Sequence, residues 1–99
     1  MYIVKQLPEF SLWLSSLRDG MTRRRRARRL EKVQRGLLGD VQPVGEGVYE
    51  MREFFGPGWR MYYVQRGDVL IVMLAGGDKS TQQADITHAI ALAQTIEGV

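Results

Sequence analysis

The sequence contains no cysteine and only one histidine, His88. Without cysteine there can be no disulfide bond, thiolate nucleophile or cysteine-bound zinc, and this composition is typical of proteins of the reducing cytoplasm, where we expect this one. One histidine among scattered carboxylates does not make a metal-binding pattern, so we predict no metal and no other cofactor. No stretch approaches the roughly 20 apolar residues of a membrane span, and the first residues lack the pattern of a signal peptide, so we expect no membrane partner.

The length and composition indicate one globular domain over residues 1–99. Domains typically span about 100–200 residues, and a chain this short does not divide its core in two. Hydrophobic residues make up 44% and charged residues 25%, which is ordinary for a globular protein.

Positive charge is concentrated in one segment. Between Arg18 and Arg35 nine basic residues stand against two acidic ones, whereas the rest of the chain carries five basic and nine acidic residues. The local net charge of +7 exceeds the +3 of the whole chain. A field concentrated in this way attracts polyanions or an acidic protein partner.

The first 36 residues predict a short strand and two helices. Residues 1–5 contain β-forming side chains, and Pro8 suits the first turn of a helix that ends at Gly20. A second helix, capped by Thr22, extends to about Gln34. Its predicted buried seam is narrow and consists of Ala27, Leu30 and Val33, so we expect its arginines to face water or a partner.

The remainder predicts a loop, three strands and a helix. Residues 38–47 lack periodicity and indicate a loop. Strands over 48–55, 59–65 and 69–75 are separated by short turns and should be antiparallel neighbours. The segment 69–75 is apolar on both faces, which is typical of a strand covered on two sides, whereas the two earlier strands should line an open face. A last helix starts near Ser80. The expected class is α+β, in the order βααβββα.

Three blocks of sequence resemble the RelE/ParE superfamily of type II toxins, in particular its HigB-like, phage Gp49-like group. They are LLGDVQPVGEGVYEMR (37–52), GPGWRMYYVQRGD (56–68) and LAGGDKSTQQADI (74–86), and they occur in the family's order and at its spacing. The resemblance spans residues 3–93. It implies a RelE/ParE-like domain in which a small, mostly antiparallel sheet packs with two N-terminal helices and a C-terminal helix.

The same resemblance implies a toxin that cleaves messenger RNA on the ribosome and is inhibited by a cognate antitoxin. The implied antitoxin is a helix-turn-helix protein of the HigA type, and operator DNA would be contacted only through the toxin–antitoxin complex. The implied enzyme is a metal-independent endoribonuclease, or mRNA interferase, of the cytoplasm.

Metal-free RNA cleavage requires cations near the scissile phosphate, because attack by the ribose 2′-hydroxyl builds negative charge on phosphorus. Arg52 and Arg60 lie on strands that should pair across the Gly56–Gly58 turn, and Lys79 follows the next strand. We assign the two arginines to phosphate binding and charge stabilisation, because a guanidinium group matches phosphate oxygens. Lys79 would hold the scissile phosphate or relay a proton, so these three cations should meet in one patch.

Asp78 is an alternative base, and Tyr62 could stack a nucleobase or position a hydroxyl group. Each candidate also has a purely structural interpretation. Arg52 could form a surface ion pair with a neighbouring glutamate, and Asp78 with Lys79 could form an ordinary turn and helix cap. Tyr62 could be a packing residue. His88 could act as an acid or base, or simply be a partly exposed helix residue.

The arginine-rich helix offers a binding surface for the phosphates of RNA or the ribosome, or for an acidic antitoxin, rather than only a solvated face. The residues assigned to this surface are Arg23, Arg24, Arg25, Arg26, Arg28 and Arg29. Two other functions stay open at this point. One is a non-enzymatic, ParE-like inhibitor of DNA gyrase, and the other is a basic nucleic-acid-binding module without catalysis.

Overall fold

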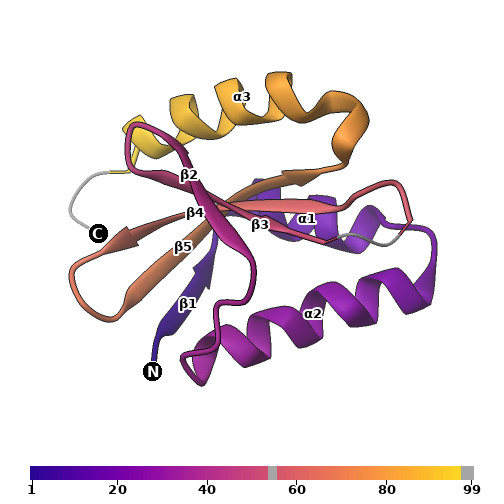
Figure 1. Ribbon diagram of the computed structural model, residues 1–99, viewed down its shortest axis with the longest axis horizontal. Coiled ribbons are helices and arrows are strands. Elements are labelled where there is room, and N and C mark those ends of the chain that lie inside the picture. Colours follow the sequence, from indigo (N-terminus) through magenta and orange to yellow (C-terminus); the bar gives the residue numbers. More distant parts are fainter. Residues whose placement is uncertain (54–55, 97–99) are drawn as a thin grey trace.

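A computed structural model describes residues 1–53 and 56–96 and shows an α+β protein with a five-stranded, mostly antiparallel sheet and three α-helices (Figure 1). The elements follow the order β1 (Ile3–Gln6), α1 (Pro8–Ser16), α2 (Gly20–Gln34), β2 (Val41–Gly45), β3 (Val48–Arg52), β4 (Arg60–Arg66), β5 (Leu70–Gly77), the 3₁₀ helix η1 (Lys79–Thr81) and α3 (Gln82–Gln94). Phe54 and Phe55, the end of one predicted strand, lie outside the described residues.

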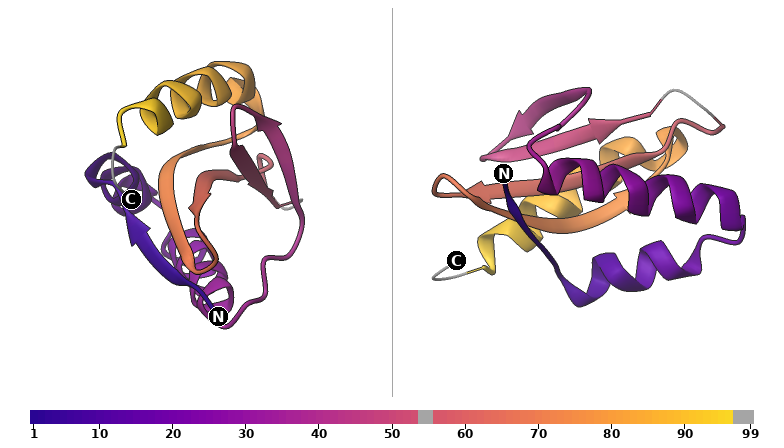
Figure 2. Two further views of the ribbon diagram at one scale, coloured as in Figure 1. Left: turned by 90° about the vertical axis from the view of Figure 1, so that its left-hand side faces the viewer. Right: turned by 90° about the horizontal axis from the view of Figure 1, so that it is seen from below.

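The sheet has the strand order β1-β5-β4-β3-β2, in which only the β1–β5 pair is parallel. Figure 2 shows α3 on one face of the curved sheet and α1 with α2 on the other. Successive residues of each strand point alternately toward the α1–α2 side and the α3 side of the sheet. One core, against α1 and α2, contains Phe10, Leu30, Met51 and Tyr63. The other, against α3, contains Tyr62 and Leu74.

β5 confirms the prediction of a strand covered on two sides, since α1 and α3 both pack against it. The prediction of an open face for the two earlier strands is wrong for β4. Arg60 to Val64 are all buried there, because β4 is the central strand of the five. None of the described helices is both long and apolar enough to cross a membrane.

The loop predicted over residues 38–47 is wrong, because β2 adds a strand to the expected order. Val41 pairs with Met51 of β3, and the register shifts between Pro43 and Gly45. Pro43 cannot donate a backbone hydrogen bond and Gly45 has φ +119°, which explains why the segment lacks a strand pattern. β2 tolerates this proline and this glycine because it is an edge strand, where one side makes no hydrogen bonds to a neighbouring strand.

The boundary between the first two helices also differs from the prediction. α1 ends at Ser16, and Gly20 is the first residue of α2 rather than the end of α1. Asp19, and not Thr22, caps α2, since its carboxylate accepts a hydrogen bond from the backbone N–H of Met21. Thr22 is buried and its hydroxyl donates to the same carboxylate at 2.8 Å.

Candidate functional site

Arg60 and Lys79 lie together around the tight turn that precedes β4. The backbone N–H of Lys79 donates to the carbonyl of Pro57 at 3.2 Å. Gly58 has φ +77°, and a Cβ atom there would lie 3.0 Å from Nη1 of Arg60 and 3.2 Å from Cβ of Lys79. Only glycine fits this position without strain. The two cations consequently line one open pocket, which Glu53 and residues 56–58 complete.

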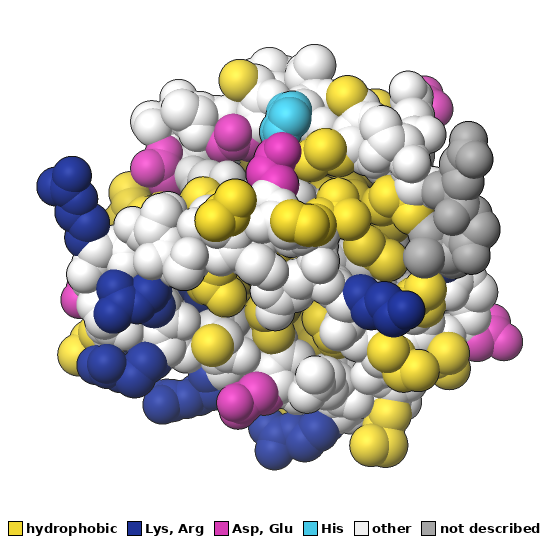
Figure 3. Space-filling model, turned by 180° about the vertical axis from the view of Figure 1, so that it is seen from behind, with side chains coloured by type: hydrophobic (Ala, Val, Ile, Leu, Met, Phe, Trp, Pro, Cys, Tyr) yellow, Lys and Arg dark blue, Asp and Glu magenta, His cyan; other side chains and the backbone are white. Residues whose placement is uncertain are grey.

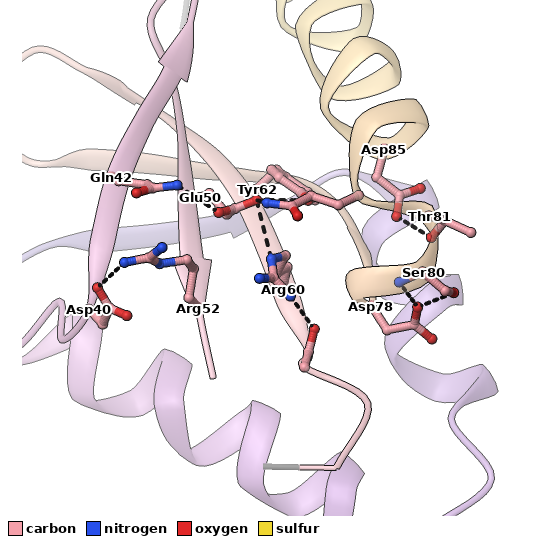
Figure 4. A network of polar contacts seen from close by, with 12 residues as sticks. Asp40, Gln42, Glu50, Arg52, Arg60, Tyr62, Asp78, Ser80, Thr81 and Asp85 are labelled. Carbon is pink, nitrogen blue, oxygen red and sulfur yellow. Dashed lines mark hydrogen bonds and ion pairs between the residues drawn. The ribbon is translucent and has the colours of Figure 1, made fainter. Parts of the chain in front are cut away.

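The Arg60 guanidinium is held at two of its nitrogens (Figure 4). Nη1 donates to the carbonyl oxygen of Gly58 at 2.7 Å, and Nε lies 3.5 Å from Oε2 of Glu50 in an ion pair that is too long and poorly aligned for a hydrogen bond. Nη2 makes no hydrogen bond with residues 1–53 or 56–96. Arg60 is only 9% exposed. This arrangement fixes the guanidinium and leaves one terminal nitrogen for a ligand.

Glu50 is fully buried beneath Arg60 and gathers donors from three other side chains (Figure 4). They are Tyr62 Oη at 3.1 Å, Gln82 Nε2 at 3.0 Å and Gln42 Nε2 at 3.2 Å. Glu50 was not predicted as a site residue from the sequence. The sequence feature that could have indicated its burial is a charged residue between two apolar ones in a strand that packs against helices.

Tyr62 does not provide a platform for a nucleobase, which corrects that prediction. Its ring is fully buried and its hydroxyl is occupied by Glu50. Burial, together with the negative charge of Glu50, raises the pKa of Tyr62 well above its usual value of 10.0. Tyr62 is therefore a packing residue that donates one hydrogen bond.

Arg52 is adjacent to Arg60 in the sheet but makes a different ion pair. The two residues stand directly opposite each other in the β3–β4 register. The guanidinium of Arg52 turns toward β2, where Nη2 lies 3.2 Å from Oδ1 of Asp40 (Figure 4). Arg52 lines a neighbouring pocket, which Glu53 also borders. The predicted three-cation patch is thus a pair, Arg60 with Lys79, flanked by Arg52.

Asp78 acts as a cap. Its carboxylate accepts hydrogen bonds from both the hydroxyl and the backbone N–H of Ser80. These hydrogen bonds lower the pKa of Asp78 below its usual 3.8, which makes it a weak base. His88 is an exposed residue of α3 whose ring contacts Glu9 of α1. Neither His88 nor Asp78 lines the pocket of Arg60 and Lys79.

Two of the α2 arginines are buried, which contradicts the expectation that all of them face outward. Arg26 is 1% exposed and Arg29 is 9% exposed. Both converge on Glu53 Oε1, Arg26 through Nη2 at 2.9 Å and Arg29 through Nη1 at 2.6 Å. Arg29 also donates to the backbone carbonyls of Leu38 and Asp40, and to that of Arg52. These buried arginines join α2 to the sheet.

Glu53 lies where three pockets meet. One is the pocket of Arg60 and Lys79, the second contains Arg52, and the third is lined on α2 by Arg25, Arg26, Arg28, Arg29 and Lys32. Partial burial acts to raise the pKa of Glu53, but the hydrogen bond from Arg29 and the charge of Arg26 outweigh it and hold that pKa below 4.5. The basic residues that line these three pockets together form a surface from α2 to β4, which we call the cationic band. They are Arg25, Arg26, Arg28, Arg29, Lys32, Arg52, Arg60 and Lys79.

The exposed arginines of α2 divide into two faces. Arg25 and Arg28 face the cationic band, whereas Arg23 and Arg24 border a shallow groove between α1 and α2. The floor of that groove is apolar and includes Leu14 and Ala27. Seen from behind, in Figure 3, Lys and Arg side chains gather along the lower edge, over α2. Ala27 was predicted to be buried but is exposed, and Leu30 and Val33 are buried as predicted.

The fold and site define a small α+β protein in which the arginine that begins the central strand and a lysine of the following 3₁₀ helix lie together in a cationic band. The chain is 38% identical over 93 residues to an uncharacterized protein of Haemophilus influenzae, and the match covers 94% of each chain. The chain therefore belongs to the same family as this Haemophilus protein. No protein-family model matches the chain, and no solved structure matches it.

Proposed function

We propose that the protein is the toxin of a type II toxin–antitoxin module, of the RelE/ParE type, and that it cleaves messenger RNA on the ribosome without a metal. The observation that carries this proposal is the shared pocket of Arg60 and Lys79, whose cations are anchored on separate elements beside a basic helix. The resemblance of three sequence blocks to the HigB-like group supports it independently.

The pocket suits a phosphodiester that is attacked by its own ribose. The 2′-hydroxyl gives its proton to solvent as its oxygen forms a bond to phosphorus, the bond to the 5′-oxygen breaks, and the intermediate carries additional negative charge on the non-bridging oxygens. Arg60 offers Nη2 to these oxygens, and its orientation is already fixed before substrate arrives. Such preorganised cations commonly contribute the largest part of transition-state stabilisation. Lys79 is exposed and supplies a second charge, with protons that can pass to the leaving oxygen.

The cationic band serves substrate binding in this proposal. Arg25, Arg28 and Lys32 are exposed on α2 and border the pocket that meets Glu53. Phosphates of messenger or ribosomal RNA would pair with them and release condensed counterions, which favours binding most at low salt, so binding should weaken as salt rises.

The groove between α1 and α2 serves the antitoxin in this proposal. Its apolar floor is bordered by Arg23 and Arg24, which favours an amphipathic helix with an apolar stripe and acidic flanks. Docking there would leave Arg60 untouched, so inhibition would act by blocking access to the ribosome.

Induction of plasmid-borne variants tests the nuclease. Wild type should arrest growth, and primer extension should reveal new 5′ ends in messenger RNA. Arg60→Ala and Lys79→Ala should abolish both effects without loss of folding. Arg66→Ala is the matched control, because Arg66 lies at the other end of β4, away from the pocket, and should stay toxic. Full toxicity of the Arg60 and Lys79 variants, or a DNA-damage response with intact messenger RNA, would contradict the proposal; the latter would favour gyrase inhibition.

A further inference from the structure

The buried carboxylate of Glu50 connects three other elements around the proposed site, β2, β4 and α3. Gln42 reaches it from β2, Tyr62 and Arg60 from β4, and Gln82 from the first turn of α3 (Figure 4). Glu50 itself lies on β3 and is 0% exposed.

Stability alone gives little reason for a charge at this position. A buried carboxylate is costly unless it is paired and hydrogen-bonded, and replacing a buried ion pair by apolar residues of similar size is often neutral or stabilising. Val48, on the same face of β3, packs in the apolar core against α3. The polar cluster begins where the strand approaches Arg60.

The contacts of Glu50 instead fix the direction of the two cations. On one side its Oε2 lies 3.5 Å from Nε of Arg60, and the carbonyl of Gly58 holds Nη1 of the same guanidinium. The hydrogen bond at Nη1 and the ion pair at Nε together restrain the planar group, so that Nη2 has a preferred orientation.

On the other side Gln82 donates to the same Oε2 at 3.0 Å. Gln82 directly follows the 3₁₀ helix that contains Lys79, so this hydrogen bond ties the backbone that carries Lys79 to the sheet. A single carboxylate oxygen therefore restrains both Arg60 and the turn that carries Lys79.

We propose that Glu50 is the positioning residue of the site. It does not touch substrate, but it orients Arg60 directly and, through Gln82, fixes the position of the turn that carries Lys79 relative to Arg60. The proposal rests on the proposed nuclease function, which gives the two cations a common target. Its consequence for the orientation of Arg60 can nevertheless be measured without any activity.

The first test follows the Nε–H group of Arg60 by NMR, in protein labelled with ¹⁵N and assigned by comparison with Arg60→Ala. In wild type this resonance should be resolved and slow to exchange, because Nε faces a buried carboxylate. In Glu50→Gln it should shift and exchange faster, while backbone resonances far from the site stay in place. Glu46→Gln, which changes an exposed glutamate in the turn between β2 and β3, should leave it unchanged. An unaltered Arg60 resonance in folded Glu50→Gln would overturn the proposal.

The second test measures single-turnover cleavage of ribosome-bound messenger RNA. Glu50→Gln should lower the cleavage rate about 100-fold, because loss of alignment at a reacting centre has effects of this order, while half-saturation by ribosomes stays as in wild type. In the residual cleavage by an Arg60→Ala variant the same substitution should cause a smaller loss, since only its effect through Gln82 on the Lys79 turn remains. Equal losses in both backgrounds would show that Glu50 does not act through Arg60.

If Glu50→Gln fails to fold, two milder variants can test the positioning role of Glu50 in its place. Tyr62→Phe removes one donor to Glu50 and Gln82→Ala removes another. Gln82→Ala should lower the cleavage rate with unchanged ribosome binding, and an unchanged rate would contradict the coupling to Lys79. If wild type itself shows no cleavage, the nuclease function fails, whereas the NMR result still decides whether Glu50 orients Arg60.

Discussion

Replacement of Glu53 by glutamine should destabilise the protein markedly, because one carboxylate oxygen holds both buried arginines of α2. Breaking a buried ion pair by removing one partner typically costs about 3–5 kcal/mol. Glu53 is 25% exposed, so water compensates for part of the loss and we expect about 2 kcal/mol. In a domain of about 100 residues each kcal/mol shifts the melting temperature by about 4–8 °C. Thermal unfolding at pH 7, followed by circular dichroism, should therefore show a decrease of roughly 8–16 °C.

The same substitution should change the dependence of stability on pH. The pKa of Glu53 lies below 4.5 in the folded protein, so its ionised form stabilises the fold. This contribution is complete above the pKa of the unfolded chain and is lost as pH falls through the folded pKa. The stability difference between wild type and Glu53→Gln should accordingly be largest near neutral pH and should shrink below about pH 4.5.

Glu46→Gln is the matched control, since it removes the same charge from an exposed turn. Urea unfolding of both variants at pH 7 would show whether the loss is specific to Glu53. If Glu53→Gln melts as wild type and the control do, the ion pairs with Arg26 and Arg29 contribute nothing to stability.

Three further predictions concern packing and the two faces of α2. Gly76→Ala should lower the free energy of unfolding by about 1–3 kcal/mol in urea titrations, because a Cβ atom would lie 2.4 Å from the ring of Trp13; an unchanged midpoint would show that the ring moves freely. The double change Arg25→Gln and Arg28→Gln should weaken RNA binding and reduce the slope of log K against log salt by about 0.7 per lost contact, as measured by fluorescence anisotropy; an unchanged slope would exclude these contacts. Ala27→Glu should prevent inhibition by the product of the adjacent reading frame while growth arrest persists, and rescue equal to that of wild type would exclude the groove.

The sequence predicts apolar elements of this fold better than polar ones. The strand near the N-terminus, the helix that begins at Pro8, and the hairpin between β4 and β5 follow from local signals in the chain. β2 does not, because its pairing with β3 depends on backbone hydrogen bonds that Pro43 and Gly45 permit only at an edge. Thr22 was a reasonable cap by residue type, but Asp19 stands three residues earlier and binds it.

The site shows the same limit. Arg60 and Lys79 were predicted to lie together, and they do, because the turn at Gly58 is encoded locally. The burial of Arg26 and Arg29 was not predicted, because their partner Glu53 is more than twenty residues away in the chain. Glu50 was not predicted as a site residue either, because its partners come from three other elements that only the folded sheet and α3 bring together.

The parallel pairing of β1 with β5 bears on when the proposed site is assembled during synthesis. β1 leaves the ribosome well before its partner Leu70–Gly77, which follows it by more than sixty residues. Lys79 and Gln82 follow immediately. Contacts so distant in sequence form late, because closing a long loop must precede them. A nascent chain that stops before residue 70 lacks Lys79 and Gln82, so under the proposed function incomplete translation products should show no nuclease activity.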